Sequence, residues 1–258
     1  MSDKNYKYIY GPVPSWRLGR SLGVDPVFKG RKVCNFDCSY CQLQKKSLLI
    51  NERESFVDCR DIIEEIDLLP PLKIDYITFS GAGEPTLAGN LGKMIKAVKQ
   101  IRREKIAVIT NSSLLHRKDV QEDLLSADFV MAKLDASTQR IFNTVNRPLE
   151  TITIKHIISG IKEFKKNYKG KLALQIMFIE DNKKSAKEIA EIVREIHPSE
   201  VQINTPLRPC KVKPLSELEL NQIESYFYGL NTISVYKAEK NKIKSISDKD
   251  TLKRRGKG

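Results

Sequence analysis

The sequence Cys34-Asn-Phe-Asp-Cys38-Ser-Tyr-Cys41 places three of the chain's five cysteines within eight residues. An odd number of cysteines, crowded in this way, does not fit a disulfide framework in a chain of 258 residues. Reduced thiols with metal-ligand spacing fit the pattern better, so we expect a cytoplasmic protein. The segment therefore predicts a loop whose thiolates bind a metal centre.

Two kinds of metal centre agree with this loop. The first is a zinc site completed by a distant ligand, but zinc knuckles usually pair two CxxC-type halves, and no second half follows. The histidines His116, His156 and His197 are isolated from one another in the sequence. The second is a cubane iron–sulfur cluster whose fourth iron has no protein ligand. An open coordination position of this kind turns a structural metal into a reactive one.

The loop resembles the signature of the radical S-adenosylmethionine (radical SAM) superfamily, CxxxCxΦC, whose aromatic position is filled here by Tyr40. The resemblance makes Tyr40 a candidate for SAM binding. The resemblance covers roughly residues 10–210 and implies two cofactors, SAM and a [4Fe–4S] cluster bound by Cys34, Cys38 and Cys41. It implies an enzyme that reductively cleaves SAM to a 5′-deoxyadenosyl radical, which then abstracts hydrogen from a substrate. The electron would come from a separate donor of the flavodoxin or ferredoxin type.

Strand-like and helix-like segments alternate along the chain. Apolar runs predict buried strands, and apolar residues at helical spacing follow most of them. This alternation predicts an α/β fold with a parallel sheet covered by helices. The resemblance implies a partial (β/α)6 barrel over 22–230, with a lead-in at 1–21 and a basic extension at 231–258; periodicity alone leaves an open doubly wound sheet as the alternative. The strands are expected near 22–33 and at 75–80, 106–110, 129–135, 172–179 and 201–205.

In either architecture the loops after the carboxyl ends of the strands form the active face. The segment Gly81-Ala-Gly83-Glu84-Pro85 resembles the family's GGE element, which implies that Gly81, Gly83 and Glu84 bind the amino group of SAM. Glycines allow a close approach of the backbone to a ligand, and a carboxylate suits an ammonium group. The alternative is an ordinary β–α turn.

Other polar residues follow the later strands and are further candidates for SAM binding. Asn111 and Ser112 are candidates for the ribose, and Asn204 for the adenine or the carboxylate. Asp135 would point into the barrel with Lys133, where the two either pair or lie in water at the mouth. Each of these positions is also typical of a plain turn or loop residue. Arg147 is a candidate anion ligand or a solvated side chain. Cys59 is expected to be structural, and Cys210 to be a small loop residue, with a substrate-facing thiol as the alternative.

The turn-rich segment 11–23 resembles the lead-in of uncharacterised archaeal and bacterial radical SAM proteins related to the wyosine tRNA-base synthases. Arg17 and Arg20 within it are candidate ligands for an anionic substrate; the alternative is a rigid, irregular wall over the open edge of the barrel. The wyosine synthases carry an additional cluster from upstream cysteines, and this sequence departs from them because no cysteine precedes Cys34.

The net charge of +13 points to a polyanionic partner. Residues 237–258 contain nine Lys or Arg and three Asp or Glu, a net +6, and few apolar residues, so we expect a mobile tail that either contacts RNA or is simply solvated. A tRNA base is therefore one candidate substrate, and a peptide, a protein or a small molecule is the alternative. A zinc or iron–sulfur protein that binds nucleic acid without catalysis is the rival class.

No membrane partner is expected. No stretch approaches the roughly 20 apolar residues that a membrane helix needs. The N-terminus also lacks the apolar run of a secretory signal.

Overall fold

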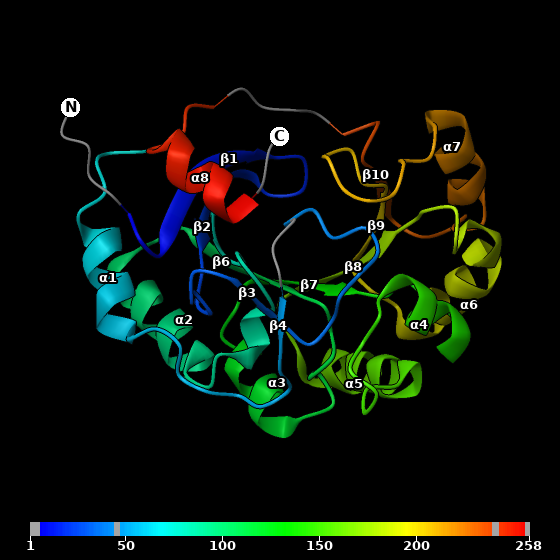
Figure 1. Cartoon of the computed structure of the whole chain (residues 1–258), viewed down its shortest axis with the longest axis horizontal. Coiled ribbons are helices and arrows are strands. Elements are labelled where there is room, and N and C mark those ends of the chain that lie inside the picture. Colours follow the sequence, from blue (N-terminus) through cyan, green and yellow to red (C-terminus); the bar gives the residue numbers. More distant parts are fainter. Residues whose placement is uncertain (1–5, 44–46, 239–242, 256–258) are drawn as a thin grey trace.

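An eight-stranded sheet organises the chain, which the computed structural model describes at residues 6–43, 47–238 and 243–255. The strand order is β1-β2-β5-β6-β7-β8-β9-β10; β1 is antiparallel to β2, and the other neighbours are parallel. The sheet is curled and confirms the partial (β/α)6 barrel (Figure 1). The strands are β1 Ile9–Ser15, β2 Gly19–Val24, β5 Tyr76–Phe79, β6 Lys105–Thr110, β7 Phe129–Lys133, β8 Lys171–Met177, β9 Glu200–Asn204 and β10 Thr232–Ser234.

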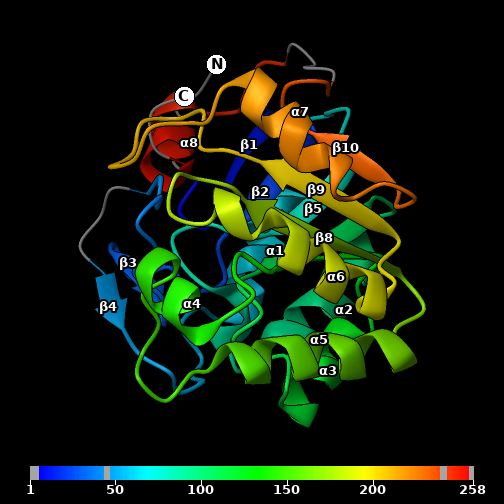
Figure 2. The same ribbon diagram turned by 90° about the vertical axis from the view of Figure 1, so that its right-hand side faces the viewer.

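The helices follow the outside of the curved sheet in chain order, from α1 through α3 and α5 to α6 (Figures 1 and 2). Helix α7 begins with a capping box formed by Ser216 and Glu219. None of the described helices has both the length and the apolar character to cross a membrane. The helices are α1 Cys59–Asp67, α2 Leu91–Ile101, α3 Lys118–Leu124, α4 Gln139–Val145, α5 Ile154–Asn167, α6 Ala186–Ile196, α7 Glu217–Ser225 and α8 Asp248–Arg255, with short 3-10 turns at Pro85–Leu87 and Lys183–Ser185.

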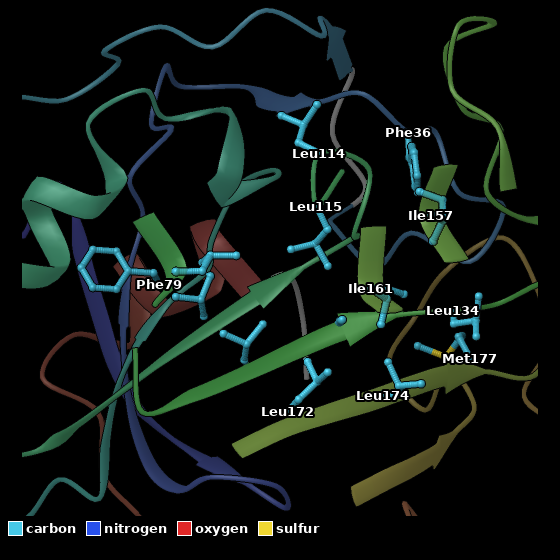
Figure 3. Close-up of a cluster of buried hydrophobic side chains, with 14 of the residues drawn as sticks. Phe36, Phe79, Leu114, Leu115, Leu134, Ile157, Ile161, Leu172, Leu174 and Met177 are labelled. Atoms are coloured by element: carbon cyan, nitrogen blue, oxygen red, sulfur yellow. The ribbon is translucent and has the colours of Figure 1, made fainter. Parts of the chain in front are cut away.

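The core lies between the strands and these helices. The apolar stripe of α6 is buried throughout, because its residues recur every three or four positions and face the sheet. Figure 3 shows part of the core, in which Phe36 joins the same cluster of buried side chains as Ile157 and Ile161 of α5. The ring of Phe36 also packs edge-on against Phe142 of α4, with 5.3 Å between the ring centroids. Burying a Phe side chain contributes about 1.5–3 kcal/mol, which holds the segment around Phe36 to the core.

The first parallel strand is shorter than predicted. β2 ends at Val24, and a separate short strand, β3 (Lys32–Cys34), leads to the cysteines and pairs with β4 (Ser47–Leu49). The N-terminal segment is not an irregular wall, because β1 and β2 form an antiparallel hairpin. The turn of this hairpin closes at Gly19, whose φ of +62° favours glycine.

The turn between β1 and β2 lies at the amino ends of the parallel strands, opposite to the end that carries the cysteines. Arg20 pairs with Asp75 just before β5, at the amino ends of the parallel strands. Arg17 precedes Arg20 in the same turn, where its guanidinium lies over the ring of Trp16. The active face is expected at the carboxyl ends of these strands, so Arg17 and Arg20 lie away from it. Their binding of an anionic substrate stays a prediction.

The C-terminal segment is ordered where the structure describes it. β10 adds a parallel strand beside β9, and α8 packs against β1. The Ile246 N–H donates to the Gly11 carbonyl at 2.6 Å, and the Thr251 hydroxyl accepts from the Gly11 N–H at 3.0 Å. Residues 243–255 therefore contact β1 through α8 and the segment before it, whereas a mobile tail was expected. Lys240, Lys242 and Lys257 of the basic segment lie outside the described residues.

Candidate cluster-binding site

Three cysteines lie on one loop beside the turn that follows β5. Cys34 ends β3, and Cys38 and Cys41 follow; we call residues 34–41 the cluster loop. Cys34 is buried, the other two are half-buried, and all three are free thiols. Burial raises the pKa of Cys34 to about 12 and that of Cys38 to about 11. These thiols therefore need the positive charge of a bound metal centre to become thiolates.

The glycine-rich turn 81–84 supports one side of the cluster loop. The Val33 N–H donates to the Ala82 carbonyl at 2.9 Å, and the Glu84 N–H donates to the Val33 carbonyl at 2.9 Å. A Cβ atom at Gly83 would lie 1.7 Å from the Val33 carbonyl oxygen, so only glycine fits there. Gly81 has a φ of +130° and lies against Asp25. The turn therefore holds the strand that carries Cys34, in addition to joining β5 to the next helical turn.

The segment after α4 supports the other side of the cluster loop. The Asp37 N–H donates to the Arg147 carbonyl at 3.0 Å, and the Leu149 N–H donates to the Asn35 carbonyl at 3.0 Å. Pro148 completes this antiparallel contact opposite Phe36. The Arg147 side chain is exposed, as the solvated alternative predicts, so Arg147 contributes its main chain to the cluster loop.

Two asparagine amides reach the cysteine sulfurs. Asn111 Nδ2 lies 3.7 Å from Cys34 Sγ, and Asn146 Nδ2 lies 3.7 Å from Cys38 Sγ. The Phe36 N–H also donates to Cys34 Sγ at 3.5 Å. Hydrogen bonds to sulfur stabilise cluster thiolates and influence their reduction potential. The predicted ribose ligand Asn111 is thus adjacent to the first cysteine.

The carboxylate of Glu84 joins the glycine-rich turn to the end of β6. Its Oε1 accepts from the Thr86 N–H at 3.0 Å and from the hydroxyls of Thr86 and Thr110, each at 2.7 Å. Its Oε2 accepts from the Asn111 N–H at 2.6 Å. Burial raises the pKa of this carboxyl group, although the hydrogen bonds act to lower it. Because Oε2 accepts one hydrogen bond from the described residues, it retains a lone pair for an ammonium group.

Tyr40 and Asp135 form a buried pair at the cluster loop. The Tyr40 hydroxyl donates to Asp135 Oδ2, and Asn146 Nδ2 donates to the same oxygen at 2.7 Å. Asp135 Oδ1 accepts from the Met177 N–H at 2.7 Å and lies 3.4 Å from Lys133 Nζ, as the pairing alternative predicts. The Asp135 side chain is buried, and it fixes the aromatic residue of the signature. Its contact with SAM stays a prediction.

Ser112 and Asn204 lie near the carboxyl ends of β6 and β9, as predicted. The Ser112 hydroxyl donates to the Lys133 carbonyl at 2.9 Å, which ties the end of β6 to β7. Asn204 is buried, and its main-chain carbonyl accepts from the Phe178 N–H at 2.7 Å. Their contacts with SAM stay predictions.

The donor set of the cluster loop fits an iron–sulfur cluster. Among the residues that the structure describes, no three His, Cys, Asp or Glu side chains close on a single ion. A cubane cluster does not require such convergence, because each thiolate binds a different iron. The two remaining cysteines have other surroundings: Cys59 opens α1, and the Cys210 thiol donates to the Val212 carbonyl at 3.2 Å.

Two residues of the site had no interpretation from sequence. Asn35 is fully buried, accepts from the Asn111 amide at 2.8 Å and donates to the Ser113 hydroxyl at 2.8 Å. Lys32 Nζ donates to the Phe36 carbonyl at 3.0 Å. An asparagine in a loop gives no sequence signal, because asparagine is a common turn residue. Lys32 could have been noticed because it lies at the end of the expected strand near 22–33, two residues before Cys34.

Comparison with known proteins agrees with this site. The model of the radical SAM superfamily matches residues 31–197, more than half of the chain. A UPF0026 protein of Synechocystis sp. is 39% identical over 219 residues, covering 84% of this chain and 81% of that protein. A UPF0026 protein of Methanocaldococcus jannaschii is 37% identical over 244 residues, covering 92% of this chain and 74% of that protein. The fold is similar to that of TYW1 with a lysine-pyruvate adduct bound, with a TM-score of 0.65 at 16% identity over 88% of this chain and 78% of that one.

These findings confirm the resemblance, including the archaeal and bacterial relatives. Enzymes of this family use a [4Fe–4S] cluster and SAM and generally take an electron from an external donor. The chain belongs to the radical SAM superfamily of enzymes.

Proposed function

We propose that Cys34, Cys38 and Cys41 bind one [4Fe–4S] cluster whose remaining iron is open to SAM. The observation that carries this proposal is the double support of the cluster loop, by the turn 81–84 on one side and by residues 145–149 on the other. Main-chain hydrogen bonds on both sides keep the three sulfurs at a constant spacing, which a cluster with only three protein ligands requires.

When bound, the reduced cluster and SAM supply a 5′-deoxyadenosyl radical for hydrogen abstraction from a substrate. The residues of this chain bind and orient the cluster and SAM. Glu84 accepts the ammonium group of SAM at its Oε2 lone pair, and Gly81 and Gly83 let the main chain approach the ligand. Asn111 links Glu84 to Cys34, because its N–H donates to the carboxylate and its amide donates to the sulfur. The Tyr40–Asp135 pair fixes the residue before Cys41.

For the substrate we propose a tRNA base, and for the electron donor a flavodoxin or ferredoxin. The net charge of +13 supports an anionic partner, because Lys and Arg neutralise backbone phosphates. A peptide or small-molecule substrate is the alternative outcome of an RNA-binding test.

The assay for 5′-deoxyadenosine tests the proposed enzyme. Protein reconstituted anaerobically with iron and sulfide is incubated with SAM and dithionite, and the nucleoside is quantified by chromatography. We expect 5′-deoxyadenosine to form only when both SAM and reductant are present. A reconstituted protein that binds metal yet releases none would favour the non-catalytic metalloprotein.

Glu84→Gln is expected to weaken SAM binding about ten- to a hundred-fold, because a charge-assisted hydrogen bond contributes about 1.5–3 kcal/mol. The amide oxygen can still accept from Thr86 and Thr110, whereas the amide nitrogen that replaces Oε2 cannot accept from the Asn111 N–H. No cysteine is changed, so the cluster should remain. The measurement is SAM affinity by equilibrium binding, with the absorbance of the cluster as a check. Glu104→Gln is the matched control, because Glu104 pairs with Arg102. Equal SAM affinity in the wild type and Glu84→Gln would assign this carboxylate a structural role only.

Neutralising the end of α8 is expected to weaken tRNA binding. Exchange of Lys253, Arg254 and Arg255 for Gln removes three positive charges and retains Ile246 and Thr251, which join this segment to β1. If each charge neutralises one phosphate, the slope of log affinity against log salt should fall by about two to three. Binding is measured across a salt series. The control exchanges the exposed residues Lys166, Lys169 and Lys187 for Gln; equal slopes for the two triple variants would contradict a specific role for α8.

A further inference from the structure

A buried lysine lies against the cluster loop. Among the residues that the structure describes, Lys32 is the only lysine or arginine in the buried class, with 3% of its surface exposed. Its Nζ donates to the Phe36 carbonyl at 3.0 Å and lies 3.6 Å from Asp37 Oδ1. Both contacts are to residues between Cys34 and Cys38, so the ammonium group is fixed to the loop that carries the sulfurs.

Phe36 connects the ammonium group of Lys32 to the first cysteine. Phe36, whose carbonyl accepts from Lys32, also donates its N–H to Cys34 Sγ at 3.5 Å. Burial of an ammonium group is costly unless negative charge lies nearby. The exposed Asp37 supplies part of that charge, and a cluster bound to the three cysteines would supply more.

We propose that the Lys32 ammonium group stabilises the negative charge of the cluster held by Cys34, Cys38 and Cys41, and thereby makes its one-electron reduction easier. This inference rests on the proposed function of these cysteines. In the reduction an external flavodoxin or ferredoxin loses one electron and the cluster gains it, while Lys32 keeps its proton. The reduction potential of a cluster depends on the net charge of its surroundings, and a nearby buried cation favours the reduced form.

The test compares two methionine variants by redox titration. Lys32→Met removes the charge and retains an unbranched apolar side chain of similar length. Lys29→Met is the matched control, because Lys29 pairs with Glu54 at 3.1 Å and is 38% exposed. Each reconstituted protein is titrated anaerobically while the reduced cluster is followed by electron paramagnetic resonance. We expect Lys32→Met to shift the ratio of reduced to oxidised cluster at least about tenfold toward the oxidised form, which is about 59 mV for one electron. Lys29→Met should match the wild type.

The variant Lys32→Arg distinguishes the effect of the positive charge from the effect of a disrupted loop structure. Lys32→Arg retains the positive charge. Its midpoint potential should therefore lie much closer to the wild-type value than the midpoint potential of Lys32→Met does. If Lys32→Met folds but takes up no cluster while Lys32→Arg does, the charge is needed to hold the cluster, which supports the inference. If neither variant takes up a cluster, Lys32 serves the structure of the loop and the inference is wrong. Equal midpoint potentials in the wild type and Lys32→Met would overturn the inference on Lys32 and leave the proposed function intact. A wild-type protein that forms no cluster would overturn the proposed function as well.

Discussion

Replacement of Cys34, Cys38 or Cys41 by alanine is expected to abolish the cluster. The three cysteines share one doubly supported loop, so the site has no spare thiolate to replace a lost ligand. Each variant, reconstituted with iron and sulfide, should lose the broad absorbance expected at roughly 400 nm for thiolate-bound clusters, together with its bound iron and sulfide. The measurement is the absorption spectrum with iron and sulfide analysis.

Cys59→Ala and Cys210→Ala are the matched controls for this result. Cys59 begins α1, and Cys210 donates to a nearby main-chain carbonyl, so both variants should retain the full iron content. Loss of the cluster in Cys210→Ala would mean that a fourth cysteine binds it. That outcome would contradict the open iron on which the proposed function depends.

Gly83→Ala is expected to destabilise the protein and to impair cluster binding. The new Cβ would lie 1.7 Å from the Val33 carbonyl oxygen, and this atom belongs to the backbone of β3, so β3 and the turn must separate. Overpacking of this kind costs about 3 kcal/mol or more, which lowers the melting temperature on the order of 5–10 °C in a chain of this size. The measurements are thermal unfolding by circular dichroism and the iron content after reconstitution.

Gly89→Ala is the control for Gly83→Ala. A Cβ atom at Gly89 would meet its nearest neighbour at 3.7 Å, which is ordinary van der Waals contact. We expect nearly wild-type unfolding and iron content. Equal melting temperatures for the two variants would show that β3 is not held by the glycine-rich turn.

The parallel strands could be predicted because buried strands read as continuous apolar runs. Five of the six expected strands, β5 to β9, occur at the expected positions, and the sixth, β2, ends earlier. β1 was missed because Gly11, Pro12 and Pro14 indicate turns in a sequence. As an edge strand, β1 tolerates proline, which a central strand does not.

The order of the C-terminal segment could not be predicted from composition. A few contacts, including those of Ile246 and Thr251 with Gly11, join a polar segment to an edge strand more than 230 residues earlier in the sequence. Average composition contains no information on such pairings. The location of Arg17 and Arg20 could not be predicted for a related reason, because only the pairing of β1, β2 and β5 shows which end of the barrel their turn occupies.

The candidate site likewise contains features that could be predicted from the sequence and features that could not. The spacing of the cysteines and the glycine-rich turn are local patterns, and they predicted the elements that lie together in the structure. The support from residues 145–149 comes from a segment more than 100 residues after the cluster loop, and no local pattern indicates it. The same holds for the buried contacts of Asp135, whose carboxylate binds Tyr40 and a main-chain N–H.

The electron paramagnetic resonance spectrum of the dithionite-reduced protein, recorded before and after addition of SAM, tests the central claim most directly. The account predicts a signal from one reduced cluster per chain, and a change in that signal when SAM binds the open iron. A signal that SAM leaves unchanged would contradict the account.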